Sequence, residues 1–248
     1  MRTSNIILTL LAAVLATVVI VTISSSAVGG SVGGDIELSG VRAERSYDAM
    51  PLRHLRVGGP IRVLLAAGAP GLRIEADEAL LDALADADPD PATLSIEVPR
   101  GVRLSADEIV AHVTTPTLEE ISLSGRVYLS SEGVLPFARN AINLSGSCSV
   151  DLEYADARQL DLGASGSADV DLRGRTRALV AGFSGSGDLD AAGLSAAIVR
   201  INSSGSASAV VRADSLLEVR SSGSGDVRYH GQPRVSFTNS GSGKLRAI

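Results

Sequence analysis

The sequence has few aromatic residues. Only 3% of its 248 residues are Phe, Trp or Tyr, and Trp is absent. The core must therefore be built from Val, Leu, Ile and Ala, which supply most of the 45% hydrophobic content. Small and β-branched side chains of this kind favour stacked strands over a helical bundle. The length suffices for one large domain or two small ones.

Cysteine and histidine are also sparse. Cys148 is the only cysteine, which excludes an intrachain disulfide and a cysteine-based zinc site. It stands within a repeat whose later copies carry Ala or Gly, so we interpret it as a small buried residue rather than a reactive thiol. His54, His112 and His230 share no spacing typical of metal ligands. We expect no metal, no cofactor and no catalytic residue.

Positive charge is in deficit. The chain has 22 Lys and Arg against 28 Asp and Glu, a formal net charge of −6. Nucleic-acid binders normally present a basic face, so this balance argues against a nucleic-acid partner.

The N-terminus contains the one long apolar run. Arg2 is followed by an uncharged, mostly apolar stretch over residues 6–23, and Ser25, Ser26 and Ala27 form an acceptable cleavage site. Residues 1–27 are interpreted as a signal peptide or, alternatively, as an uncleaved membrane anchor that would bring the chain into membrane contact. Either segment predicts export across a membrane, to the periplasm or cell surface. Residues 28–42 are expected to form a linker.

A Ser-Gly motif recurs through the C-terminal half. Successive central glycines are 21, 20, 19, 20, 18 and 18 residues apart. They are Gly125, Gly146, Gly166, Gly185, Gly205, Gly223 and Gly241. This spacing defines a unit of about 20 residues over residues 119–248.

Apolar residues form columns when the units are aligned on this glycine. The position four residues before it holds Ile121, Ile142, Leu162, Ala181, Ile201, Val219 and Phe237. The position four residues after it holds Leu129, Val150, Val170, Leu189, Ala209, Val227 and Leu245. Apolar residues two apart, separated by polar ones, indicate strands with one buried face.

One such unit has no partner against which to bury its apolar face, but stacked units bury it together. We therefore predict an all-β, right-handed parallel β-helix (a β-solenoid) over residues 43–248, with Ser-Gly-Ser at a corner between two strands. Glycine supplies positive φ at that corner, and stacked serines hydrogen-bond along the column.

Aspartates follow several corners. A candidate interaction ladder comprises Asp151, Asp171, Asp188, Asp190 and Asp226. Arg173, Arg175 and Arg177 lie nearby and can offset the repulsion between stacked carboxylates. Calcium binding, as in glycine-rich nonapeptide repeats, is an alternative, but the acids are one residue out of place and several copies lack them. A paired-carboxylate glycosidase site is a further alternative that we consider weaker than a solvated face.

The region before the repeats mixes strands with one helix. "HLRVGG", "IRVLLAA", "LRIEAD" and "ATLSIEVP" alternate as strands between Gly-Pro and Ala-Pro turns. Residues 77–87 have helical spacing, with Asp77 placed as the N-cap and Pro89 and Pro91 beyond the end. We expect this region to be the irregular first part of the solenoid and its cap.

The order of these motifs resembles one family. "RSYD", "LRVGGPIRVLLAAGAPGLRIEADEALLDAL", "ATLSIEVPRG" and the repeated "SGSGD" together resemble the bacterial putative auto-transporter adhesin head domain, or GIN domain. The resemblance spans roughly residues 43–248. It implies a right-handed parallel β-helix, export and an adhesion or interaction role, and it supplies no catalytic residues.

The leading functional hypothesis is a non-enzymatic, exported module that binds an envelope protein or a polysaccharide along a solenoid face. The alternative is a carbohydrate-active β-helix enzyme, a lyase or hydrolase. A third hypothesis is end-to-end self-association through the last coil.

Overall fold

A computed structural model describes residues 38–47, 51–86, 92–98 and 109–248. The expected signal or anchor segment, residues 1–27, lies outside these ranges, as do most of the expected linker and Pro89 and Pro91. No helix among the described residues is long and apolar enough to cross a membrane.

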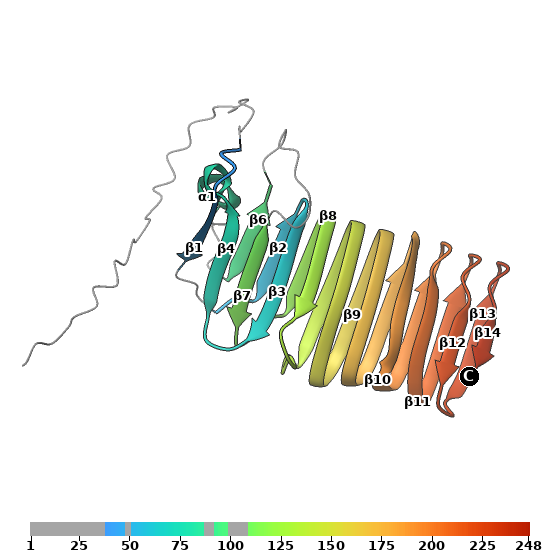
Figure 1. The fold of residues 1–248 in the computed structure, drawn as a ribbon. Helices are drawn as coiled ribbons and strands as arrows, with labels where there is room; N and C mark the ends of the chain where they lie inside the picture. Colours follow the sequence, from blue (N-terminus) through green and yellow to red (C-terminus); the bar gives the residue numbers. More distant parts are fainter. Residues whose placement is uncertain (1–37, 48–50, 87–91, 99–108) are drawn as a thin grey trace, which may run out of the picture. The chain divides into compact units, whose positions relative to one another are not determined.

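The described chain is almost entirely β-structure in one sheet (Figure 1). The N-terminal strands are β1 (Arg42–Tyr47), β2 (His54–Gly58), β3 (Ile61–Ala67), β4 (Gly71–Asp77), β5 (Ala85–Asp86), β6 (Thr93–Glu97) and β7 (Val110–Thr115). The repeat strands are β8 (Glu120–Ser131), β9 (Arg139–Phe183), β10 (Ser186–Ser203), β11 (Ser208–Ser221), β12 (Val227–His230), β13 (Arg234–Asn239) and β14 (Leu245–Ala247).

The repeats stack in parallel, as the periodicity predicts. β8 pairs with β9, β9 with β10, and β10 with β11, all in parallel register. The first half of β11 pairs in parallel with β12, and its second half pairs in parallel with β13. β12 pairs in parallel with β14. The β-solenoid is therefore confirmed, while its handedness stays a prediction.

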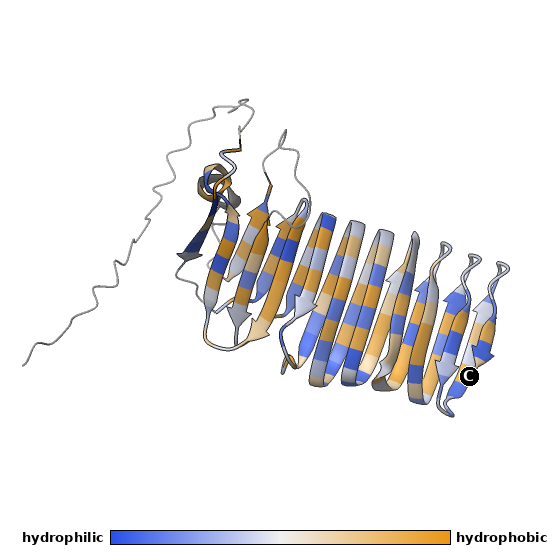
Figure 2. Cartoon of the chain, viewed as in Figure 1, coloured by the Kyte–Doolittle hydropathy of each residue, from blue (hydrophilic) through white to orange (hydrophobic). Residues whose placement is uncertain are grey.

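The apolar columns form the core. Bands of apolar residues run across the strands in Figure 2. The column four residues before the glycine is buried from Ile121 to Val219, and the column four residues after it is buried from Leu129 to Val227. The last members are exceptions, since Phe237 is 41% exposed and Leu245 only partly buried. Packing of each rung on the next, rather than any local preference, buries these side chains.

Spatial order departs from chain order before the repeats. β2 and β3 pair in parallel with the two halves of β8 and so form the rung beside it. β6 and β7 pair in parallel with the opposite edges of β2 and β3. The rung made by β6 and β7 thus lies outside the one made by β2 and β3, although it follows β3 in sequence.

Antiparallel strands cover this end of the parallel stack. β4 pairs antiparallel with β7, and β1 pairs antiparallel with β4. The prediction of an irregular first part with a cap is confirmed in this form. The arrangement shields a parallel edge that would otherwise be open to pairing by another chain.

The helix is present but shorter than predicted. α1 spans Glu78–Leu84, whereas the pattern predicted residues 77–87. The N-cap is confirmed, because the backbone N–H of Ala79 donates to Oδ1 of Asp77 over 2.9 Å. The predicted C-terminal end is wrong, because Ala85 and Asp86 pair antiparallel with β6, and a tertiary strand pairing overrides the local helical preference.

Candidate functional site

The seven repeat glycines form one continuous column. The nearest atoms to a Cβ built on each glycine from Gly146 to Gly241 belong to the backbone of the preceding repeat glycine. Gly125 has the same relation to Gly59. The predicted row of glycines is confirmed, and Gly59 is an eighth member that the Ser-Gly motif did not reveal. Its flanking residues, Leu55, Val63 and Leu65, carry the same apolar alternation and would have identified it.

Positive φ explains glycine at only part of this column. φ is +86° at Gly125, +102° at Gly146 and +111° at Gly166, where the strand runs on through the corner. Gly185, Gly205, Gly223 and Gly241 do not take φ in the left-handed region, so the prediction is wrong for these four. Glycine is required there by close backbone stacking alone, since a Cβ would lie within 2.1 Å of the carbonyl oxygen of the preceding glycine.

An open groove lies on the strand that leads into this corner. Its volume is about 1020 Å³, and in all seven repeats it is lined by the three residues that precede the glycine. Arg56 and Val57 on β2 and Glu97 on β6 extend it. Six strand spacings of about 4.8 Å separate the seven repeats, so the groove is roughly 30 Å long and runs across the strands.

One wall of the groove is a column of exposed serines. Its members directly precede the repeat glycines and are Ser124, Ser145, Ser165, Ser184, Ser204, Ser222 and Ser240. The predicted bonding along the column is present at Ser124, Ser165 and Ser204, which donate to carbonyl oxygens of the preceding rung over 3.4–3.5 Å. A hydroxyl that donates once still has acceptor capacity, so this wall presents hydrogen-bonding oxygens along its length.

A second column, three residues before each glycine, forms the floor. Asn143, Gly163, Gly182 and Asn202 occupy it on four successive rungs at the centre of the groove. Nδ2 of Asn143 donates to Oε1 of Glu120 over 3.0 Å, and its Oδ1 lies 3.4 Å from the place of a Cβ on Gly163. The fixed amide therefore presents its oxygen beside the glycine floor.

The predicted aspartate ladder lies beyond the corner and consists of two columns. Asp171 pairs in register with Asp190, and Asp151 is close enough to raise the pKa of Asp171. Asp188 pairs with Asp169 and Ser208, in a different column.

Four of the five ladder carboxylates accept hydrogen bonds from other groups of the chain. Arg173 donates to Asp171 over 3.1 Å and also to Asp151, as the sequence predicted for that arginine. Partial desolvation raises the pKa of Asp171, and the neighbouring aspartates add to this while Arg173 opposes it. The Asp190 carboxylate accepts from the N–H of Ala192, and that of Asp226 accepts from the N–H of Lys244.

The three histidines and the cysteine have separate environments. Cys148 is 3% exposed, and burial raises the pKa of its thiol, which fits the structural interpretation. His54 Nδ1 contacts the hydroxyl of Thr93 over 3.2 Å. In the part of the chain that the structure describes, no group of three or more His, Cys, Asp or Glu is arranged to hold a metal ion.

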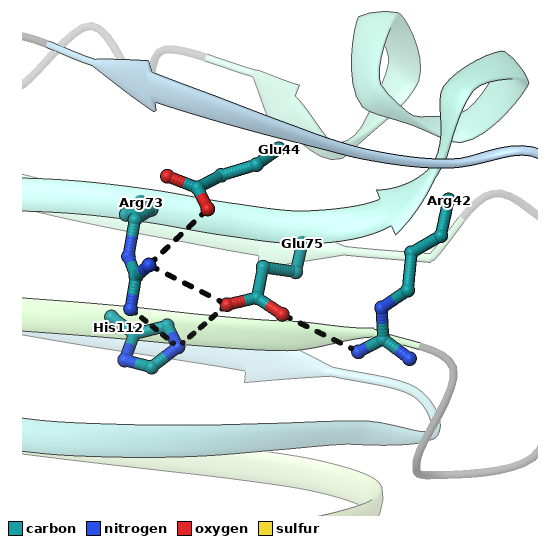
Figure 3. A network of polar contacts seen from close by, with 5 residues as sticks. All are labelled: Arg42, Glu44, Arg73, Glu75 and His112. Carbon is teal, nitrogen blue, oxygen red and sulfur yellow. Dashed lines mark hydrogen bonds and ion pairs between the residues drawn. The ribbon is translucent and has the colours of Figure 1, made fainter.

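A polar network that the sequence did not reveal joins the cap strands to the solenoid (Figure 3). Glu75 on β4 lies 3.6 Å from Arg42, 3.6 Å from Arg73 and 3.2 Å from Nε2 of His112. Arg73 also reaches Glu44 over 3.2 Å. The network spans β1, β4 and β7, and because its side chains are partly or largely exposed, each pair adds little stability singly.

Comparison with solved structures shows the same fold in several bacterial proteins. A putative adhesin from Bacteroides fragilis shares 21% identity with a TM-score of 0.76 and covers 85% of this chain and 99% of its own. A putative adhesin from Parabacteroides merdae shares 17% identity with a TM-score of 0.64, covering 85% and 98%. A putative lipid binding protein from Parabacteroides distasonis shares 18% identity with a TM-score of 0.69, also covering 85% and 98%.

No curated protein matches the chain at a significant level. The family model described as putative auto-transporter adhesin, head GIN domain, matches residues 51–233, which include the glycine column from Gly59 to Gly223. This chain therefore belongs to the auto-transporter adhesin head GIN domain family.

Proposed function

We propose that the chain is a non-enzymatic, exported interaction module of the cell envelope that holds its partner along the groove. The observation that carries this proposal is the repetition of the same three lining positions through seven repeats, which builds one long contact surface. Repeat folds use extended surfaces of this kind for binding. The family and two of the three named structural relatives are described as adhesins, and the third is described as a lipid binding protein; these descriptions agree with an exported binding role.

The lining chemistry supports binding over catalysis. Among the described lining residues only Glu97 carries a carboxylate, whereas glycoside hydrolysis ordinarily uses a pair. The aspartate columns are proposed as a secondary contact surface. Asp188 is the ladder member best placed for it, because it is exposed and the other four carboxylates bond within the chain.

A comparison of two serines tests the role of the groove. Ser184 lines it, while Ser186, two residues later and also exposed, does not. Full-length chain and its Ser184→Tyr and Ser186→Tyr variants would be used to capture material from a cell-envelope extract. We expect the captured component to be lost with Ser184→Tyr and kept with Ser186→Tyr. Equal capture by all three would refute the groove as the contact surface.

A turnover assay tests the enzymatic alternative. The chain incubated with polygalacturonate should yield no unsaturated product. Turnover that disappears with Asp188→Ala would establish an enzyme and overturn the proposal.

A further inference from the structure

The geometry points to an uncharged, extended polysaccharide strand as the ligand of the groove, with two consecutive sugar rings over Gly163 and Gly182; this inference rests on the proposed function. Three features carry it: glycines without a structural need, the periodicity of the groove and its charge.

Neither floor glycine is required by the fold. Gly163 and Gly182 do not take φ in the left-handed region. A Cβ at Gly163 would approach no atom closer than 3.4 Å, and one at Gly182 none closer than 3.9 Å. The corner glycines are different, since a Cβ there would meet backbone. Glycine weakens a strand and marks places where a ligand approaches the backbone closely.

Polar groups surround these two glycines. Asn143 and Asn202 occupy the same column on the rungs to either side, and both are exposed. Ser203 is 8% exposed and lines the same groove, and its Oγ is the one buried side-chain polar atom without a partner among the described residues. The alternating burial of Asn202, Ser203 and Ser204 turns this hydroxyl towards the solenoid interior, so the exposed amides of Asn143 and Asn202 are the side-chain groups here that a hydroxyl-rich ligand reaches.

The direction and spacing of the groove favour a glycan over a peptide. A peptide recognised by strand addition needs a free sheet edge, but the groove crosses strands whose backbone groups are already paired. Side chains on one face of an extended peptide repeat about every 6.6 Å, which does not match rungs about 4.8 Å apart. One sugar ring of an extended β-linked glycan is about as long as the distance between neighbouring rungs. Successive rings along the groove therefore meet the equivalent serine of successive rungs.

The charges favour a neutral strand. The charged residues among the described lining are Arg56 and Glu97 near one end and Arg220 towards the other. Arg220 donates to Glu218 over 2.5 Å. The lining between them is uncharged and combines serine hydroxyls and asparagine amides with the apolar residues Leu144, Ala164 and Phe183, so it does not attract a polyanion.

Affinity gel electrophoresis of the full-length chain tests the proposal, with a soluble mixed-linkage β-glucan as neutral probe and polygalacturonate as anionic probe. We expect retardation by the β-glucan alone. Gly182→Leu should weaken it by about tenfold or more, because the side chain fills the floor.

Gly71→Leu is the matched control. Gly71 also lies in a strand, outside the groove, and a Cβ there meets nothing closer than 4.0 Å. The midpoint of thermal unfolding should be unchanged in both variants, which separates lost binding from lost folding.

Three results would overturn the proposal: no retardation by the β-glucan, equal retardation by polygalacturonate, or unchanged binding in Gly182→Leu. If any occurs while Ser184→Tyr still abolishes capture from envelope extract, the ligand class is wrong and the proposed function stands. If capture is also insensitive to Ser184→Tyr, both fail.

Discussion

The carbonyl oxygen of Gly205 lies 1.6 Å from the place that a Cβ of Gly223 would occupy. The two corners are stacked so closely that neither chain segment leaves room for a side chain.

Gly223→Ala should therefore strongly destabilise the fold, by about 2–4 kcal/mol, because the atom it meets is backbone. Gly182→Ala is the control and should change the free energy of unfolding by less than about 1 kcal/mol, since its Cβ has space. Chemical denaturation of both variants measures the difference. Similar values for the two would contradict the close stacking.

Tyr154 and Asn140 form a buried polar pair. The hydroxyl of Tyr154, which is 1% exposed, donates to Oδ1 of Asn140 over 2.7 Å, and Nδ2 of Asn140 donates to the carbonyl of Leu118 over 3.2 Å. Burial raises the pKa of Tyr154, so the phenol stays protonated and remains the donor.

Tyr154→Phe should cost about 1–3 kcal/mol of unfolding free energy, because it leaves a buried amide oxygen unsatisfied. Tyr128→Phe serves as control, since Tyr128 is 42% exposed and its ring packs on Arg62. An equal, small effect of both changes in urea denaturation would argue against the buried pair.

Asp77 makes the cap region sensitive to acid. Partial desolvation opposes ionisation of its carboxyl, but hydrogen bonds from Ser39, Ala79 and Gly40 outweigh it and place its pKa below the ordinary 3.8. A lowered pKa in the folded state means that this stabilisation is present above the unfolded-state pKa. It is lost as the pH falls through the folded-state pKa.

Asp77→Asn keeps an N-cap acceptor but does not titrate. The wild type should have a higher midpoint of thermal unfolding than Asp77→Asn at neutral pH, and this difference between the two midpoints should disappear in acid. Midpoints measured across this pH range test the prediction, and a constant gap would disprove it.

Arg173 offsets repulsion between the stacked aspartates. Replacing it with Met keeps the aliphatic stem beside Gly193 and removes the charge that Asp151 and Asp171 share. We expect a loss of about 1 kcal/mol or less, as these side chains are exposed, and a smaller loss in high salt.

Adding Asp171→Asn to Arg173→Met should recover part of that loss, and Arg177→Met alone should have little effect. A double-mutant cycle at low and high salt gives the coupling. A coupling free energy of zero between Arg173 and Asp171 in that cycle would show that Arg173 does not offset the repulsion between the aspartates.

The last coil exposes apolar side chains on strands at the edge of the sheet. Val235 and Phe237 on β13 are 39% and 41% exposed. We propose that a second copy covers them, end to end. Light scattering should show concentration-dependent dimers that Phe237→Lys abolishes, and a wild-type monomer at high concentration would refute this.

Periodicity made the repeats predictable from sequence. Each repeat has the same local pattern, so stacking by simple translation buries Ile142 on Ile121 and places Gly146 on Gly125. The family resemblance rests on these repeats together with the segments that precede them, and it is confirmed. The Asp77 cap was predictable because a capping bond is local.

The remaining features needed the tertiary structure, because they depend on pairings between segments without a shared period. Chain order does not specify that β6 lies outside β2, that β4 reverses against β7, or that Ala85 leaves the helix for a strand. The groove is a further case. The sequence shows which residues face outward, but the path of the main chain at the corner decides whether that outward face is hollow.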